Sequence, residues 1–219
     1  MPEVVPAELD SREKILDAAE RLFARRGFSG VGLRELAEAA GISKSGLLHH
    51  FRGKTELYAA VAGRILQHFE QRTLQALASG GDPLERFDRW LDAMIATLAE
   101  QPTRARLLLR SLFEDDDLAG ESEEEKAVDR TIHRLFSHVA RLLREGMEQG
   151  TFRLSSIPHT LQSLVGLLVY HFASGEFGET LLQQSLFSPA AVRKRREAVK
   201  ALLYGGILAR PRVAEATTK

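Results

Sequence analysis

Apolar residues recur every three or four positions along most of the chain, which is the spacing of one face of an α-helix. No segment shows the strict apolar–polar alternation of a half-buried strand. Capping residues, glycines and prolines divide the pattern into about nine helices. They span roughly residues 10–26, 33–40, 44–51, 54–78, 83–101, 103–113, 128–149, 158–173 and 189–207. The sequence therefore predicts an all-α protein.

Two short helical patterns within residues 32–51 meet at Gly41. Glycine tolerates the positive φ that ends a helix abruptly, and Ser43 is a favourable N-cap for the helix that follows. The apolar positions form the core of this unit: Leu33, Leu36, Ala37, Ile42, Leu47 and Phe51. The second helix presents small, basic and polar residues outward: Lys44, Ser45, Gly46, His49 and His50. Such a helix-turn-helix places one helix in the major groove of DNA.

Charge is distributed unevenly, although the 30 Lys and Arg residues equal the 30 Asp and Glu residues in number. A neutral total does not by itself favour nucleic acid. Residues 43–54, however, carry cations and two histidines without an acid, whereas residues 114–125 carry eight acids without a base. We interpret the acidic stretch as a solvated connection. We interpret the basic residues 193–196 as the solvent-facing side of the last helix.

The sequence contains no motif for metal binding, catalysis or membrane insertion. The absence of cysteine excludes disulfides and thiolate metal sites and fits a reducing cytosol. None of the seven histidines has the spacing of a metal site, and no nucleophile or phosphate-loop motif occurs. We therefore predict no metal, no cofactor and no enzymatic activity. The longest apolar run, residues 164–173, is about half of the roughly 20 residues that span a bilayer, so we expect a cytoplasmic protein without a membrane partner.

Several spaced motifs resemble one family of bacterial proteins. They are Phe-Ala-Arg-Arg-Gly-Phe at 23–28, Leu-Ala-Glu-Ala-Ala-Gly-Ile-Ser at 36–43, Leu-Leu-His-His-Phe at 47–51 and Lys-Thr-Glu-Leu at 54–57. Together they resemble the DNA-binding domain of the tetracycline-repressor (TetR) family of transcription regulators. The resemblance covers about a quarter of the chain, from residue 11 to residue 60. This chain departs from the family pattern at Val31 and Gly32, at Leu48 and at Gly53. Threonines, a tyrosine and a serine are usual at these places.

The resemblance implies an N-terminal DNA-binding domain at residues 9–56 and a helical ligand-binding and dimerisation domain at residues 57–210. Residues 1–8 and 211–219 are predicted to be disordered tails. It further implies a homodimeric repressor that binds a pseudo-palindromic operator and is released by a small molecule. The effector, the operator, the regulated genes and the choice between repression and activation do not follow from the sequence.

The candidate DNA contacts are Arg34, Lys44, Ser45, Gly46, His49, His50 and Lys54. Lys44 begins the recognition helix, where a lysine can donate to the O6 and N7 atoms of guanine. Lys54 lies at the start of the next helix, where its ammonium and the helix dipole would both favour a phosphate. The simpler reading of each residue is a solvated side chain on a helix surface.

The helical domain offers candidates for two further roles. Large side chains with a few polar tips suit a ligand pocket: Trp90, Met94, Phe136, His138 and Tyr170. The helix at 163–173 is apolar almost all round, so it needs cover from its own domain or from a second chain. The corresponding dimer-interface candidates are Leu164, Leu168, Val169, Phe172, Val199, Leu202 and Leu203.

Two rival functions remain open from the sequence. The first is a non-specific DNA-associated helical protein whose C-terminal domain binds another protein, and it would show no preference for one operator. The second is an enzyme on a helical scaffold, which would have to show turnover. The motif favours the specific regulator over both.

Overall fold

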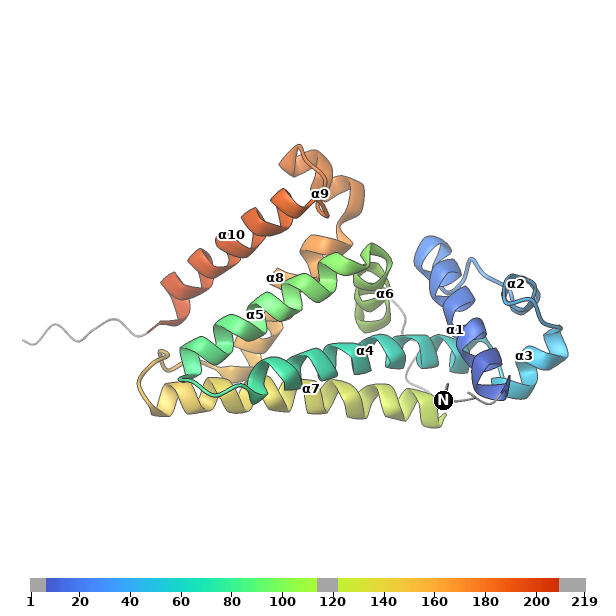
Figure 1. Ribbon diagram of the computed structural model, residues 1–219, viewed down its shortest axis with the longest axis horizontal. Coiled ribbons are helices and arrows are strands. Elements are labelled where there is room, and N and C mark those ends of the chain that lie inside the picture. The colour runs from blue at the N-terminus through green and yellow to red at the C-terminus, as the bar shows by residue number, and fades with distance from the viewer. Residues whose placement is uncertain (1–6, 114–121, 209–219) are drawn as a thin grey trace, which may run out of the picture.

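The computed structural model describes residues 7–113 and 122–208, and in that part of the chain every extended regular element is a helix (Figure 1). The helices are α1 (Ala7–Arg26), α2 (Leu33–Ala39), α3 (Lys44–His50), α4 (Lys54–Ala78), α5 (Pro83–Glu100), α6 (Pro102–Phe113), α7 (Glu123–Glu148), α8 (Ile157–Ala173), α9 (Gly175–Leu182) and α10 (Pro189–Ile207). The all-α prediction is confirmed. Most of the predicted tails and most of the acidic stretch lie outside the described residues, whereas residues 7 and 8 of the predicted N-terminal tail lie in α1.

Two unequal parts share the long helix α4 (Figure 1). α1, α2 and α3 gather at one end of the molecule, and α4 leaves that end to run between α5 and α7. α8 packs against α5, α6 and α7, and α10 packs against α5. The predicted domain boundary at residues 56 and 57 therefore falls in the first turn of α4. Because α4 belongs to both parts, any shift of α4 moves the DNA-binding end relative to the helical domain or moves the two together.

Capping chemistry sets the predicted helix starts. The Ser43 hydroxyl accepts a hydrogen bond from the Gly46 amide at 3.0 Å. Asp82 forms a full capping box, in which it accepts from the Glu85 amide at 2.9 Å and Glu85 bonds back to the Asp82 amide. The turn between α2 and α3 needs its glycine, because Gly41 has a φ of 71°. These predicted signals are confirmed.

Two helix starts and one whole helix differ from the sequence prediction. α1 begins at Ala7, three residues before the predicted start at residue 10. α7 begins at Glu123, five residues before the apolar pattern, because Ser122 and Glu125 form a capping box there. α9 was not predicted at all. Its only buried residue is Gly178, so no apolar stripe faces the core to mark it.

An aromatic cluster joins the two parts of the molecule. Phe23 of α1 meets Tyr58 of α4 edge to face, with ring centroids 5.0 Å apart, and Phe28 lies 5.3 Å from Tyr58. Phe23 and Tyr58 are fully buried in a core that continues along α4 into the helical domain. Such aromatic contacts add about 0.5–1.5 kcal/mol each to the burial of their area. The N-terminal part is thus anchored on α4.

Candidate nucleic-acid interface and cavity

α3 is held by its apolar side and exposes its polar side. Leu47 is fully buried, and Phe51 just after the helix is buried too. Lys44, Ser45 and His49 are exposed, whereas Gly46 and His50 are half-buried. Leu48, at the position where the family usually has tyrosine, is also exposed. The five predicted α3 residues therefore lie on or beside one accessible surface.

Two of these residues also build the start of α3. The Ser45 and Ser43 hydroxyl oxygens lie 3.0 Å apart, within hydrogen-bond distance. A Cβ atom at Gly46 would sit 3.3 Å from the Ser43 hydroxyl and 3.9 Å from Ile42 Cβ. Glycine at 46 thus leaves room for the Ser43 cap to close tightly.

Arg34 and Lys54 lie on the helices before and after α3, and their side chains differ in how firmly they are held. The Arg34 guanidinium is exposed and pairs with Glu38 at 2.9 Å, an interaction worth little in solvent. The Lys54 ammonium instead donates to the Phe28 carbonyl at 3.0 Å and lies 4.1 Å from the centroid of the Phe28 ring. Lys54 therefore fastens the start of α4 to the turn after α1. Its predicted phosphate contact would have to coexist with that bond or replace it.

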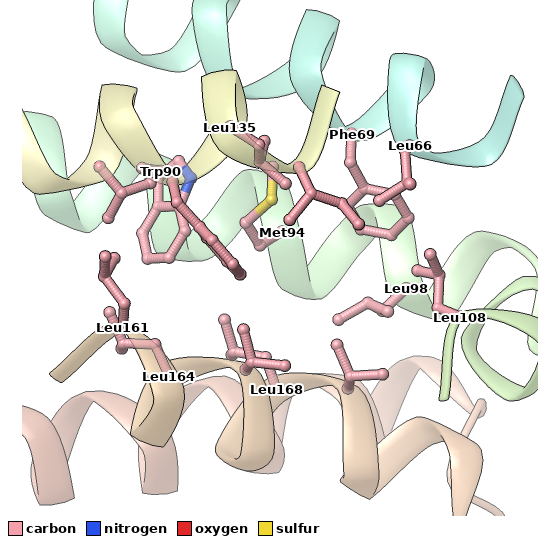
Figure 2. Close-up of a pocket in the computed structure, with 15 residues that line it drawn as sticks. Leu66, Phe69, Trp90, Met94, Leu98, Leu108, Leu135, Leu161, Leu164 and Leu168 are labelled. Atoms are coloured by element: carbon pink, nitrogen blue, oxygen red, sulfur yellow. The ribbon is translucent and has the colours of Figure 1, made fainter. Parts of the chain in front are cut away.

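An apolar cavity of about 80 Å³ lies inside the helical domain. Figure 2 shows α8 side chains facing those of α4, α5 and α7 across it, with α6 closing one end. All of its lining residues are apolar: Leu66, Phe69, Trp90, Met94, Leu98, Leu108, Ile132, Leu135, Phe136, Val139, Leu161, Leu164, Val165, Leu168 and Val169. The cavity can bind a ligand through apolar contact and shape alone.

The only polar atom among these side chains is already satisfied. The Trp90 indole nitrogen donates to the Thr73 hydroxyl at 3.2 Å, and that hydroxyl lies 3.7 Å from the Met94 sulfur. Thr73 is fully buried behind the wall. Because the indole N–H is engaged there, it is not offered to a ligand in the cavity.

The structure separates the predicted ligand residues. Trp90, Met94 and Phe136 lie in the wall of the cavity. His138 and Tyr170 do not, which corrects the expectation that they line it. His138 sits between Glu70 and Arg141, 3.9 Å and 3.0 Å away, and Tyr170 is 52 % exposed. Two positions along a helix turn a side chain about 200°, so each points away from its lining neighbour at 136 or 168.

The predicted dimer residues also divide. Leu164, Leu168, Phe172 and Val199 are buried within the single chain, so these four are not free for a second chain. Val169 lines the cavity and is half-buried. Leu202 is 65 % exposed and Leu203 is half-buried. The apolar periodicity of α8 thus indicated this chain's own core. The outward side of α8 and α10 carries other residues: Gly166, Tyr170, Ala198, Ala201, Leu202 and Gly205.

The basic residues at 193–196 are not all solvent-facing, contrary to our interpretation of the sequence. Arg193 and Lys194 are exposed, but Arg196 forms an ion pair with Asp92 of α5 at 3.1 Å, and Arg195 donates to the Leu167 carbonyl of α8. One turn later Lys200 reaches the carboxylates of Asp88 and Asp92, each at 2.8 Å. The ion pairs to Asp88 and Asp92 dock α10 on α5, and the Tyr204 hydroxyl adds a hydrogen bond to Asp88.

A charged junction between α1, α4 and α6 was missed by sequence reasoning. Arg64 of α4 and Arg104 of α6 both bind Glu20 of α1. The partners lie 44 and 84 residues apart in the chain, so no local pattern could have marked them.

Among the residues that the structure describes, no cluster of His, Asp and Glu could hold a metal ion, and no helix is long and apolar enough to cross a membrane.

Comparison with known proteins supports both parts. Residues 15–61 match the family model of bacterial regulatory proteins of the tetR family, and residues 83–202 match that of the tetracyclin repressor-like C-terminal domain. The transcriptional regulator AcrR of Shigella flexneri is 25 % identical over 193 residues, covering 86 % of this chain and 84 % of AcrR. The transcriptional repressor KstR of Mycolicibacterium smegmatis is 25 % identical over 150 residues, which are 64 % of this chain and 74 % of KstR.

A solved structure extends the likeness to the whole fold. AibR, crystallised in complex with isovaleryl coenzyme A and operator DNA, superposes with a TM-score of 0.72 at 18 % identity. The match covers 90 % of this chain and 99 % of AibR. With a helix-turn-helix at one end and a family-matched helical domain over more than half of its length, the chain belongs to the TetR family of DNA-binding bacterial transcription regulators.

Proposed function

We propose that this chain is a homodimeric repressor whose effector is an apolar small molecule, or the apolar part of a larger one, bound in the cavity. The observation that carries the proposal is the wholly apolar wall, in which the one indole N–H is already bonded to Thr73. A polar or charged ligand would lose its hydration there without gaining a hydrogen bond. We assign the chain no reaction.

The size of the cavity supports release by conformational change. An engineered apolar cavity of about 150 Å³ in another protein binds benzene. The cavity of about 80 Å³ is smaller, so an effector larger than benzene has to displace the walls. AibR was crystallised with both an acyl coenzyme A and operator DNA, which makes an acyl chain a reasonable first probe.

Trp90 allows a direct test, because it is the single tryptophan of the chain and lies in the cavity wall. Decanoate, decanol and isovaleryl coenzyme A should each be titrated while Trp90 emission is recorded. The proposal expects saturable changes with decanol and decanoate, and weaker binding after Leu135→Lys, which places a charge in the wall. Arg144→Lys, on an exposed side of α7, is the matched control. Unchanged emission with all three probes would contradict an apolar effector.

Support for the homodimer comes from the outward side of α8 and α10. Small residues at Gly166, Ala198 and Gly205 allow close helix approach, and Tyr170 and Leu202 add exposed apolar area. We expect Leu202→Glu to give a monomer in analytical ultracentrifugation, whereas Leu154→Glu, at a still more exposed position before α8, should stay dimeric. A Leu202→Glu protein that remains a dimer at micromolar concentration would overturn this face as the interface.

The non-specific rival has its own discriminator. Specific regulators bind their sites at least about a thousandfold more tightly than random DNA. Equal and strongly salt-dependent affinity for the chain's selected duplex and a scrambled one would favour the rival.

A further inference from the structure

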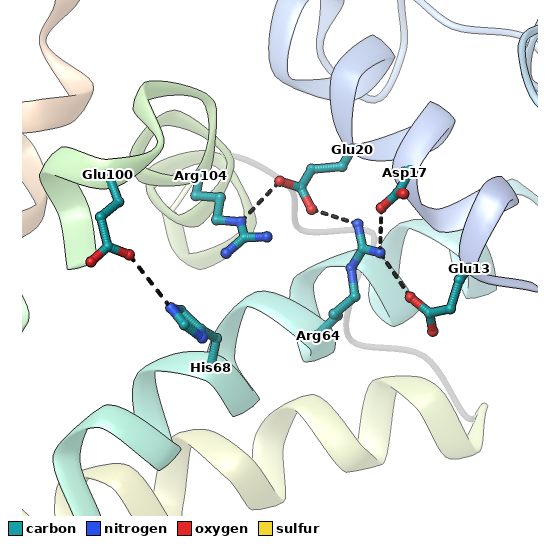
Figure 3. Close-up of polar contacts among 7 residues, drawn as sticks. All are labelled: Glu13, Asp17, Glu20, Arg64, His68, Glu100 and Arg104. Atoms are coloured by element: carbon teal, nitrogen blue, oxygen red, sulfur yellow. Dashed lines mark hydrogen bonds and ion pairs between the residues drawn. The ribbon is translucent and has the colours of Figure 1, made fainter. Parts of the chain in front are cut away.

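α6 takes part in both the cavity and the attachment of the DNA-binding domain. Leu108 of α6 lines the cavity, and Arg104, one helical turn earlier, reaches α1 (Figure 3). The Arg104 Nε atom lies 3.0 Å from a carboxylate oxygen of Glu20. A rigid helix cannot move Leu108 without moving Arg104.

Glu20 is the centre of this junction. Its side chain is 8 % exposed and accepts from Arg104 through one oxygen and from Arg64 of α4 through the other, the latter at 2.6 Å. Figure 3 shows the carboxylate between the two guanidinium groups. A buried carboxylate with two cationic partners depends on them, because removing a partner leaves a charge without compensation.

The remaining contacts of Arg64 are of a different kind. Glu13 and Asp17 approach Arg64 at 3.1 Å and 2.7 Å, but their side chains are 57 % and 58 % exposed. Exposed pairs of this kind contribute about 0–1 kcal/mol. They join α1 to α4 and do not touch α6, so they provide internal controls.

A second contact shows that α6 lies along α1. A Cβ atom on Gly27, at the end of α1, would come within 2.5 Å of the Arg110 guanidinium of α6. Arg104 beside Glu20 and Arg110 beside Gly27 thus place about two turns of α6 against the C-terminal half of α1. α6 is positioned to displace α1, which carries the rest of the DNA-binding domain.

We propose that the Arg104–Glu20 ion pair couples the cavity to the DNA-binding domain, so that α6, displaced by an effector at Leu108, shifts α1 through Glu20. This inference rests on the proposed function only in naming the cavity as the effector site. Glu20 and Arg104 are positioning residues, which touch neither DNA nor effector. Linkage requires the coupling to act in both directions, so DNA binding must also alter the cavity.

The test uses that reciprocity and needs no effector. Duplexes selected from random DNA by the wild-type dimer are added while acrylamide quenching of Trp90 is measured, and DNA binding is followed separately by anisotropy. The compared proteins are wild type, Glu20→Gln and the control Glu13→Gln. We expect DNA to change Trp90 quenching in wild type and in Glu13→Gln. In Glu20→Gln the duplex should still bind, but the change should be lost, and Glu20→Asp should restore part of it.

Two outcomes would overturn the coupling. One is a Glu20→Gln protein that binds DNA and shows the wild-type change in quenching. The other is a wild-type protein whose Trp90 does not respond to bound DNA. If Glu20→Gln fails to fold, Arg104→Gln removes the same pair from the α6 side and takes its place.

The effector arm is evaluated separately. Decanoate should weaken wild-type operator binding by about fivefold or more, a typical coupling, and should leave Glu20→Gln nearly unaffected. If decanoate fails to bind wild type, the proposed effector class is wrong, whereas the DNA-to-Trp90 arm still decides the coupling. If no duplex is selected, a random duplex at low salt serves that arm, and only the specific-operator function fails.

Discussion

The α3 surface and the cavity have opposite chemistry within one chain. The surface presents Lys44 and His49 to solvent, whereas the cavity wall contains only apolar side chains. A polyanion fits the first and an uncharged or acyl group fits the second. The junction between the α3 surface and the cavity consists of ion pairs around Glu20, which bind neither DNA nor a ligand. The contrast teaches that each site is built for a different ligand, and that communication has to pass through a third set of residues.

The largest predicted effect breaks the support of the α3 surface. Leu47→Asp places a charge at a fully buried position, so we expect a loss of about 3 kcal/mol or more in the stability of the DNA-binding domain. DNA affinity should fall with it. Leu48→Asp, one residue along and exposed, should keep the fold. Circular dichroism melting checks both, and equal melting temperatures for the two variants would contradict the assigned faces of α3.

The next prediction separates contacts to DNA bases from contacts to phosphate. Lys44→Ala should cost about 1–3 kcal/mol of binding and relax sequence preference if a base pair is recognised. Lys54→Ala should weaken all sequences alike, lower the salt slope by about one, and also lower the melting temperature through loss of the Phe28 contacts. Anisotropy titrations at several salt concentrations measure both. Uniform losses for both variants would make Lys44 a phosphate contact only.

An effect of similar size tests the hydrogen bond behind the cavity wall. Thr73→Val keeps the shape of the buried side chain but removes the acceptor for the Trp90 N–H. Leaving this donor unsatisfied should cost about 1–3 kcal/mol in unfolding free energy. Thr55→Val, at a half-buried site in the first turn of α4, is the control. Urea unfolding that gives equal losses for both variants would show that the Thr73 bond contributes nothing particular to the wall.

The smallest predicted effect is a pH dependence away from both sites. Burial, and to a smaller extent the positive charge of Arg195, lowers the pKa of His171 from 6.5 to about 4. Between these values the unfolded chain binds the proton and the folded chain does not, so stability falls as the pH drops from about 6.5 towards 4. His171→Phe should remove this part of the slope, whereas the exposed His159→Gln should retain it. Urea midpoints at several pH values measure it, and an unchanged slope in His171→Phe would refute the assignment.

The α3 surface could be predicted because its determinants are adjacent in the chain. Gly41 and Ser43 set the turn and the cap, and the apolar spacing sets which side is buried. Helix starts that depend on local capping, such as Asp82, were predictable for the same reason. α9 was not, because its apolar residues Phe177 and Leu181 point to solvent and leave no pattern tied to the core.

The cavity and the junction could be predicted only in part because they join distant residues. Periodicity shows that α8 has apolar sides but not which neighbour covers each side, so Leu164 and Leu168 were assigned to a dimer interface and not to the cavity wall. Tyr170 was chosen for its polar tip, but its position on α8 turns it outward. The Glu20 pairs with Arg64 and Arg104 depend on how three helices pack, and local sequence patterns do not show this packing.

The central claim is that ligand binding in the cavity and DNA binding at the α3 surface are coupled. The most direct measurement is the affinity of the wild-type dimer for its selected duplex, at about 150 mM salt, with and without decanoate, while Trp90 emission reports cavity occupancy. The account predicts that occupancy weakens binding by about fivefold or more. An occupied cavity with unchanged operator affinity would contradict it.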